Sequence, residues 1–242
     1  MSKAQLIVAL DVDTIEEARG LIDDLGDSVE IYKVGHQQWT NEDIISYLQL
    51  RGKKIFLDLK YYDIPNTVAS AVKSAIKRAV FLSKSPNDDP RFAPIFMLTV
   101  HISGGKEMLE VVVKAAKEHA EALNVDRPYI VGVTVLTSIT KDVGTQELVL
   151  RRARLAKESG LDGVVASVEE TAFIRRECGP DFLIVTPGIR PADASLNDQK
   201  RAATPQAAIL QGSNFLVVGR PIIQASSPRE AALRILEEMK NR

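Results

Sequence analysis

Eight short apolar runs, each followed by a longer amphipathic stretch, most constrain the fold of this 242-residue chain. Short continuous apolar runs are typical of strands that are buried on both faces of a parallel sheet. The apolar runs occupy residues 6–10, 31–34, 55–59, 96–100, 129–136, 163–166, 182–185 and 215–218. The helix-like stretches occupy residues 14–25, 41–50, 66–82, 104–122, 145–158, 168–177, 204–211 and 228–240.

Eight strand–helix units predict one (β/α)8 TIM barrel domain over residues 1–242, because such barrels typically need about 250 residues. The alternative is an open doubly wound sheet. That fold predicts a Gly-x-Gly-x-x-Gly loop after the first strand, where this chain has the segment Ala9-Leu-Asp-Val-Asp13 instead. The sequence therefore favours the barrel.

Two connections depart from the regular alternation. Residues 83–94 contain Ser-Pro, Asn-Asp-Asp-Pro and Ala-Pro, which break a helix, so we predict a surface insertion loop there. Residues 190–204 show no clear periodicity and directly follow a predicted strand. At the carboxyl end of a barrel strand, such a segment is a candidate lid.

The composition favours a soluble cytoplasmic protein that acts on small molecules. The 31 basic and 32 acidic side chains nearly cancel and form no long run of one sign, so we expect no general nucleic-acid or membrane surface. A single cysteine excludes an internal disulfide, and three scattered histidines give no metal-ligand spacing. The first ten residues lack the pattern of a signal peptide or membrane span.

Candidate site residues lie at or just beyond the carboxyl ends of the predicted strands, where a barrel places its active site. They are Asp11, Lys33, Asp58, Lys60, His101, Ser103, Thr137, Ser138, Ser167, Pro187 to Arg190, Gly219 and Arg220. In a barrel, these residues are expected to surround one mouth.

The third apolar run carries two charges. Asp58 and Lys60 are two residues apart, so a strand directs both to one face, where each must be paired or bind a ligand. Asp63 follows the strand, and Pro65 fits the first turn of a helix that Asn66 or Thr67 would cap. Taken alone, the Asp58–Lys60 pair is more often a structural ion pair than a catalytic one.

The segment Asp58-Leu-Lys60-Tyr-Tyr-Asp63-Ile-Pro-Asn-Thr67 resembles the Asp-x-Lys-x-x-Asp signature of the orotidine 5′-phosphate decarboxylase family, in its bacterial type. Other segments agree with this family in order and spacing. They are Ala9-Leu-Asp11, Lys33-Val-Gly35, Val100-His-Ile-Ser-Gly-Gly105, Leu136-Thr-Ser138, Thr186-Pro-Gly-Ile-Arg190, Asp198 to Pro205 and Val218-Gly-Arg-Pro221. The resemblance extends from about residue 6 to residue 225.

The resemblance implies decarboxylation of orotidine 5′-monophosphate to uridine 5′-monophosphate in pyrimidine biosynthesis, without a metal or organic cofactor. It implies that Lys60 stabilises and then protonates the carbanion at C6 of the pyrimidine. Asp58, Asp63 and Lys33 would complete an alternating Lys33-Asp58-Lys60-Asp63 charge array.

The resemblance also implies substrate contacts and a partner. The implied contacts are Asp11 and Lys33 with the ribose, and Thr137 and Ser138 with the pyrimidine. The implied phosphate ligands are Gln199, Gly219 and Arg220, with Arg190 and Pro187 beside them. Ile64 and Thr67 are further implied substrate-binding residues. In the family, Asp63 and Thr67 reach the site of the neighbouring subunit. We therefore expect a homodimer with two shared active sites, and residues 190–204 as a lid that closes over the phosphate.

Two alternatives remain at this stage. One is a sugar-phosphate enzyme on the same scaffold, such as 3-keto-gulonate 6-phosphate decarboxylase or hexulose 6-phosphate synthase, which shares Asp-x-Lys-x-x-Asp but uses magnesium. Lys33 discriminates against it, because those enzymes have an acidic residue at that strand end. The other is a non-catalytic phosphate-binding barrel. The charge array disfavours it, since unused buried charges cost stability.

Overall fold

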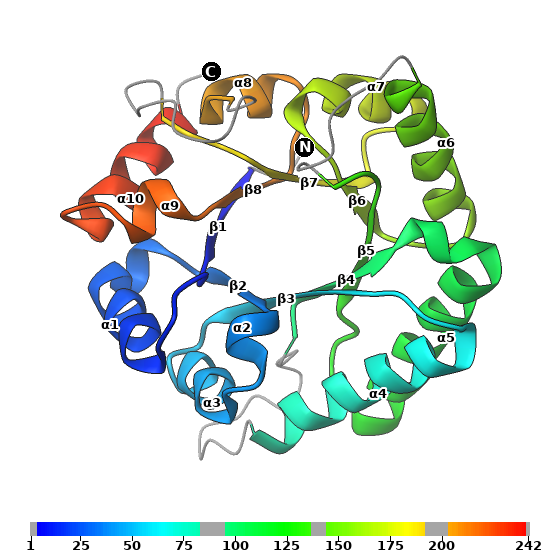
Figure 1. Cartoon of the computed structure of the whole chain (residues 1–242), viewed down its shortest axis with the longest axis horizontal. Coiled ribbons are helices and arrows are strands. Elements are labelled where there is room, and N and C mark those ends of the chain that lie inside the picture. Colours follow the sequence, from blue (N-terminus) through cyan, green and yellow to red (C-terminus); the bar gives the residue numbers. More distant parts are fainter. Residues whose placement is uncertain (1–3, 83–94, 137–143, 192–202, 241–242) are drawn as a thin grey trace.

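Eight parallel strands pair in sequence order and close into a barrel, with the first strand bonded to the last (Figure 1). The computed structural model describes residues 4–82, 95–136, 144–191 and 203–240. Figure 1 shows the helices as an outer ring around the strands. The closed barrel confirms the predicted (β/α)8 fold and rules out the open sheet. The predicted insertion at 83–94 and most of the candidate lid lie outside the described residues.

The predicted elements appear in the predicted order. The strands are β1 (Gln5–Ala9), β2 (Ile31–Gly35), β3 (Lys54–Tyr61), β4 (Met97–His101), β5 (Tyr129–Val133), β6 (Gly163–Val165), β7 (Leu183–Pro187) and β8 (Phe215–Val218). The α-helices are α1 (Ile15–Leu25), α2 (His36–Trp39), α3 (Glu42–Leu50), α4 (Pro65–Leu82), α5 (Gly105–Leu123), α6 (Thr145–Glu158), α7 (Val168–Cys178), α8 (Pro205–Leu210), α9 (Arg220–Ile223) and α10 (Pro228–Glu238). Two short 3₁₀ turns, η1 (Gly26–Ser28) and η2 (Ile102–Gly104), complete the set.

The strands separate two apolar cores. The inner core fills the barrel and contains Ile7, Ala9, Ile31, Phe56, Met97, Val131, Val185, Phe215 and Val217. The larger outer core lies between strands and helices and includes Ile55 and Leu57. Because side chains alternate along a strand, Asp58 follows the inward-facing Phe56 on the same face. The third strand thus directs a carboxylate into the barrel.

The start of α4 differs in one detail from the prediction. Pro65 is the first helical residue, as predicted. The carbonyl of Ile64 accepts the first helical hydrogen bond, from the Val68 amide at 3.2 Å. Asn66 and Thr67 therefore lie inside the first turn, and the expectation that one of them caps the helix is wrong. A proline ring does not need an amide partner, which suits it to this first position.

Candidate active site

Four charged side chains meet at the carboxyl ends of β1, β2 and β3. Lys33 Nζ lies 2.8 Å from Asp11 Oδ1 and 3.8 Å from Asp58 Oδ2, and Lys60 Nζ lies 2.8 Å from Asp58 Oδ2. We call these four residues the charge cluster. The Lys33 and Asp58 side chains are each only 12% exposed, whereas Lys60 is 32% exposed. The pair that the third apolar run carries is therefore joined by a second pair from neighbouring strands.

Strand register explains why these residues meet. Ala9 pairs with Lys33, and Gly35 pairs with Asp58, so Asp11 and Asp58 flank Lys33 from the two adjacent strands. Two opposite unit charges about 4 Å apart attract by roughly 4 kcal/mol at an effective dielectric constant near 20. Attraction of this size offsets part of the desolvation that partly buried charges suffer.

Asp63 lies apart from the charge cluster within this chain. It follows the end of β3, is exposed, and accepts a hydrogen bond from the Ile64 amide at 2.6 Å. Its neighbours Tyr62 and Ile64 are 61% and 66% exposed, and Thr67 is exposed as well. The structure thus gathers Lys33, Asp58 and Lys60 of the expected array and adds Asp11, while Asp63 is exposed on the loop after β3.

The expected phosphate-binding residues lie at the ends of β7 and β8. Pro187 is the last residue of β7, and Arg190 is 93% buried a few residues beyond it. The Arg190 amide donates to the Ala203 carbonyl at 3.0 Å, so the two ends of the segment 190–204 lie side by side. Arg220 begins α9, and Gly219 directly precedes it.

The strand order connects these residues to the charge cluster. The order β7, β8, β1, β2, β3 is continuous around the barrel, so the two arginines and the cluster share one arc of the rim. A Cβ added at Gly219 would meet only the Ala9 Cβ, at an ordinary 3.6 Å. Packing therefore leaves room for a side chain there, whereas the backbone of Gly219, with φ of −112° and ψ of −103°, lies outside the regions that other residues favour. Gly188, with φ of 78°, adopts a backbone conformation that also favours glycine.

The remaining expected contacts have different outcomes. Thr137, Ser138 and Gln199 lie outside the described residues. Ser167, at the end of β6, is the N-cap of α7, where it forms a capping box with Glu170. A helix cap is a structural role, and it explains this serine without a substrate.

His101, the last residue of β4, is held in the neutral form. Burial, together with the positive charges of Lys60 and Arg152, lowers the pKa of His101 below its ordinary value, and Asp58 opposes this only in part. The Tyr62 ring packs edge-on against the imidazole, with the ring centres 5.7 Å apart. His101 therefore contacts the loop that carries Asp63.

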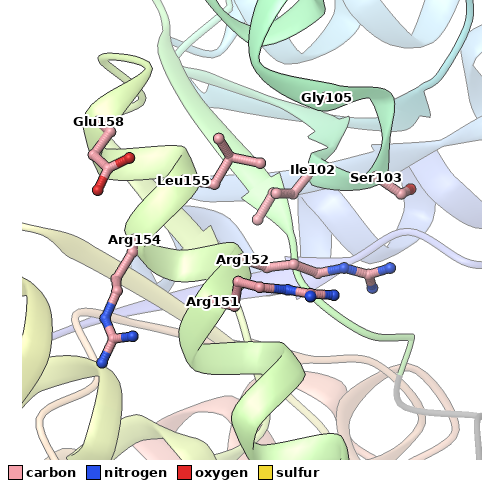
Figure 2. A pocket seen from close by; sticks show the side chains of 8 residues that line it. All are labelled: Ile102, Ser103, Gly105, Arg151, Arg152, Arg154, Leu155 and Glu158. Atoms are coloured by element: carbon pink, nitrogen blue, oxygen red, sulfur yellow. The ribbon is translucent and has the colours of Figure 1, made fainter.

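A surface cavity of about 550 Å³ lies beside the barrel mouth, between η2, the start of α5, and α6 (Figure 2). Figure 2 shows Arg151 and Arg152 extending side by side from α6, while Arg154 projects in another direction. Arg152 donates a hydrogen bond to the Thr134 carbonyl. No member of the charge cluster lines this cavity.

Two site residues have no clear signal in the sequence. The Thr99 hydroxyl, from β4, donates to Asp58 Oδ1 at 3.0 Å. Gln38 is fully buried, and its amide donates to the Val12 carbonyl at 2.6 Å, which ties down the loop after β1. Thr99 stands inside an apolar run, and Gln38 belongs to a helix of four residues, too short to show a helical period.

Within the described ranges, no group of three or more histidine, cysteine, aspartate or glutamate side chains is placed to hold a metal ion. Within the same ranges, no helix combines the length and apolar character that a bilayer crossing requires.

A closed parallel barrel with charged side chains gathered at the carboxyl ends of its strands is the arrangement of a barrel enzyme. The family model described as "Orotidine 5'-phosphate decarboxylase / HUMPS family" matches residues 4–235. The chain therefore belongs to the orotidine 5′-phosphate decarboxylase / HUMPS family.

Individual relatives agree with this assignment over the whole chain. Orotidine 5′-phosphate decarboxylase of Syntrophomonas wolfei is 41% identical, with 99% of each chain covered. The enzyme of the same name from Syntrophotalea carbinolica is 43% identical, with 98% of this chain and 96% of the relative covered. The crystal structure of orotidine 5′-phosphate decarboxylase from Lactobacillus acidophilus matches with a TM-score of 0.80 at 37% identity, covering 99% of this chain and 100% of that one.

Proposed function

We propose that this protein is a cytoplasmic decarboxylase that converts orotidine 5′-monophosphate to uridine 5′-monophosphate. The observation that carries the proposal is the partly exposed Lys60 ammonium, held 2.8 Å from Asp58 beside a second lysine at the barrel mouth. The full-length similarity to relatives named for this reaction supports the same substrate.

The decarboxylation requires a positive charge and a proton donor close to C6 of the pyrimidine. When the bond between C6 and the carboxylate breaks, carbon dioxide leaves and the electron pair stays on C6 in the ring plane. The ring cannot delocalise that pair as an enolate would. Lys60 stabilises the developing carbanion by its charge and then donates a proton to C6, after which solvent returns a proton to Lys60.

The other cluster residues prepare Lys60 for this task. Asp58 Oδ2 lies 2.8 Å from Lys60 Nζ and 3.8 Å from Lys33 Nζ, so one carboxylate holds both ammonium groups at the barrel mouth. Fixed charges of this kind need no reorganisation when charge develops on the substrate. Lys33, on the neighbouring strand β2, and its partner Asp11, which follows β1, are the ribose contacts in this proposal.

The phosphate is assigned to the arc formed by β7 and β8. Arg190 and Arg220 supply guanidinium groups, which suit phosphate because they donate two parallel hydrogen bonds. Pro187 and Gly219 stand beside them, and Gln199 on the segment 190–204 completes the proposed phosphate site. Thr137 and Ser138 are assigned to the pyrimidine edge. Phosphate binding far from C6 supplies free energy that positions the reacting ring.

The exposure of Asp63 and its neighbours supports a homodimer with shared sites. Tyr62 and Ile64 expose apolar surface on either side of Asp63, and exposed apolar side chains next to a functional loop are typical of an interface. In the proposed dimer, Asp63, Ile64 and Thr67 complete the array of the partner subunit. The one-chain structure, in which Asp63 is exposed and its carboxylate accepts from the Ile64 amide, fits this arrangement.

The reaction is proposed to need no metal or organic cofactor. The family also contains sugar-phosphate enzymes, and the similarity of the fold alone does not separate the two activities. Lys33 favours the nucleotide reaction, because its ammonium, paired with Asp11 and Asp58, occupies a position where a magnesium ion would be repelled.

The proposed function is tested by supplying orotidine 5′-monophosphate to the purified protein after exhaustive chelation. We expect loss of substrate absorbance with release of one carbon dioxide for each uridine 5′-monophosphate formed, at the same rate with and without added magnesium. A parallel assay supplies 3-keto-gulonate 6-phosphate with magnesium. Turnover of the sugar phosphate alone, or a strict magnesium requirement, would show that the nucleotide assignment is wrong.

Subunit sharing is tested by mixing two inactive variants, Lys60→Ala and Asp63→Ala. Random reassortment makes half of the dimers mixed, and each mixed dimer regains one native site, so about one quarter of the wild-type activity should return. Each variant alone serves as the control. If Asp63 acts within its own chain, mixing restores nothing.

A further inference from the structure

The pairing between β3 and β4 is broken where the two key charges lie. Between Leu57 and Tyr61, β3 advances four residues, while β4 advances only two, from Leu98 to Val100. Within this break, Lys60 adopts φ of 49°, in the left-handed region that non-glycine residues rarely occupy. Strain of this kind persists only where surrounding contacts hold it.

Thr99 lies in the middle of this break, on the β4 side. Its side chain is fully buried, and it faces the barrel interior because Met97, two residues earlier, belongs to the inner core. Its hydroxyl oxygen accepts a hydrogen bond from the Lys60 amide at 2.8 Å. The threonine side chain thus replaces the backbone partner that Lys60 would have in a regular ladder.

The same hydroxyl also holds the partner of Lys60. Since a hydroxyl has one proton and a carboxylate only accepts, the Thr99 proton points to Asp58 Oδ1, 3.0 Å away. The other oxygen, Oδ2, remains for Lys60 Nζ at 2.8 Å and Lys33 Nζ at 3.8 Å. One hydroxyl therefore fixes both the backbone of Lys60 and the rotation of the Asp58 carboxylate.

We infer that Thr99 is a positioning residue for the proposed decarboxylation, on which this inference rests. It acts through Lys60 and Asp58: by holding the left-handed turn at Lys60 and the carboxylate plane of Asp58, it aims the ammonium at the reacting carbon. Misplacing a catalytic group by about 1 Å can cost on the order of 100-fold in rate. Loss of the hydroxyl should therefore reduce kcat more than substrate affinity.

The test compares three variants with the wild type. Thr99→Val keeps the shape of the side chain but removes the hydroxyl, and Thr99→Ser keeps the hydroxyl. Thr171→Val is the matched control, since Thr171 is also fully buried but its hydroxyl donates to the Ser167 carbonyl in α7. For each protein, kcat and KM for orotidine 5′-monophosphate and the melting temperature are measured.

For Thr99→Val we expect kcat to fall about 10- to 100-fold, with KM within about threefold of the wild type. Thr99→Ser should recover kcat to within about threefold, and Thr171→Val should melt at a lower temperature with unchanged kcat. Wild-type kcat in Thr99→Val, or equal losses in the Ser and Val variants, would overturn the inference. An inactive wild type would instead refute the proposed function.

A crystal structure of Thr99→Val gives a readout that needs no activity. We expect Lys60 to leave the left-handed region, or its Nζ to move beyond about 3.5 Å from Asp58. If the valine variant does not fold, the serine variant carries the same test through its predicted wild-type geometry and kcat. An unchanged Lys60–Asp58 pair in the valine structure would refute the positioning role.

Discussion

Two partly buried groups of charges lie at opposite ends of the barrel strands, and they differ in how completely their hydrogen bonds are used. At the amino ends of β5 and β6, Asp162 accepts from Arg127 at 2.6 and 2.9 Å and from the Ile130 amide at 2.7 Å. At the carboxyl ends, Lys60 has three donor protons, and within the described chain its Nζ meets a single acceptor, Asp58.

The difference indicates which group stabilises the fold and which serves a ligand. The side chains of Lys60 and Arg127 are almost equally exposed, at 32% and 30%, so exposure alone does not separate them. Asp162 accepts three hydrogen bonds from the segment 127–130 of its own chain, and its hydrogen bond raises the pKa of Arg127 above the ordinary value. In the charge cluster, the described residues supply the partly exposed Lys60 ammonium with one acceptor for its three donor protons. The two groups thus differ in how many hydrogen bonds their charged side chains form within the described chain, and the group with unused donors is the one that we assign to the ligand.

Matched substitutions in the two groups should have opposite effects. Asp58→Asn is expected to reduce kcat at least about 1000-fold, because it removes the charge that two lysines share. Asp162→Asn should leave kcat within about threefold of the wild type. It should lower the free energy of unfolding by about 1–3 kcal/mol, because it weakens the hydrogen bonds between residue 162 and the Arg127 guanidinium. Steady-state kinetics and urea denaturation of both variants measure this. If the two variants lose similar amounts of kcat and of unfolding free energy, the functional and structural groups are not distinct.

A second prediction extends the comparison along the rim to β7 and β8. Arg220→Ala should lower kcat/KM for orotidine 5′-monophosphate about 100-fold, because it removes a charged phosphate ligand. With orotidine, which lacks the phosphate, the wild type should already be slow, and the same substitution should change the rate little. Equal losses with both substrates would show that Arg220 does not act through the phosphate.

The smallest expected effect concerns His101 and pH. The folded protein keeps His101 neutral, because burial and the charges of Lys60 and Arg152 lower its pKa, while the unfolded chain takes up a proton near pH 6.5. The unfolded state therefore binds more protons as the pH falls from 7 to 5, and stability declines. Urea midpoints of His101→Gln should decline less over this range. Parallel declines in both proteins would contradict the assigned cause.

Much of the fold follows from the sequence. Continuous apolar runs set the eight strands, since strands buried on both faces need apolar residues throughout. The fifth strand is shorter than its apolar run predicts: the run covers 129–136, whereas β5 ends at Val133. The helices α2 and α9 have four residues each and were not predicted, because one helical turn is too short to show a period.

The part of the site that depends on which strands are neighbours could be predicted from the sequence. Lys33, Asp58 and Lys60 come together because parallel neighbouring strands end at one edge. The break in the β3–β4 pairing could not be seen in one strand, because register depends on both strands. Asp11 lies beside Lys33 because β1 pairs with β2, whereas Asp63 is exposed on the loop between β3 and α4.

The most direct measurement compares two lysines on the same strand. Lys54, at the amino end of β3, has a 40% exposed side chain that lies 3.5 Å from Glu30, and it serves as the control for Lys60. We expect Lys60→Ala to lower kcat for orotidine 5′-monophosphate at least about 10,000-fold while uridine 5′-monophosphate still binds, and Lys54→Ala to match the wild type. Turnover retained by Lys60→Ala would contradict the proposal that this lysine stabilises and protonates C6.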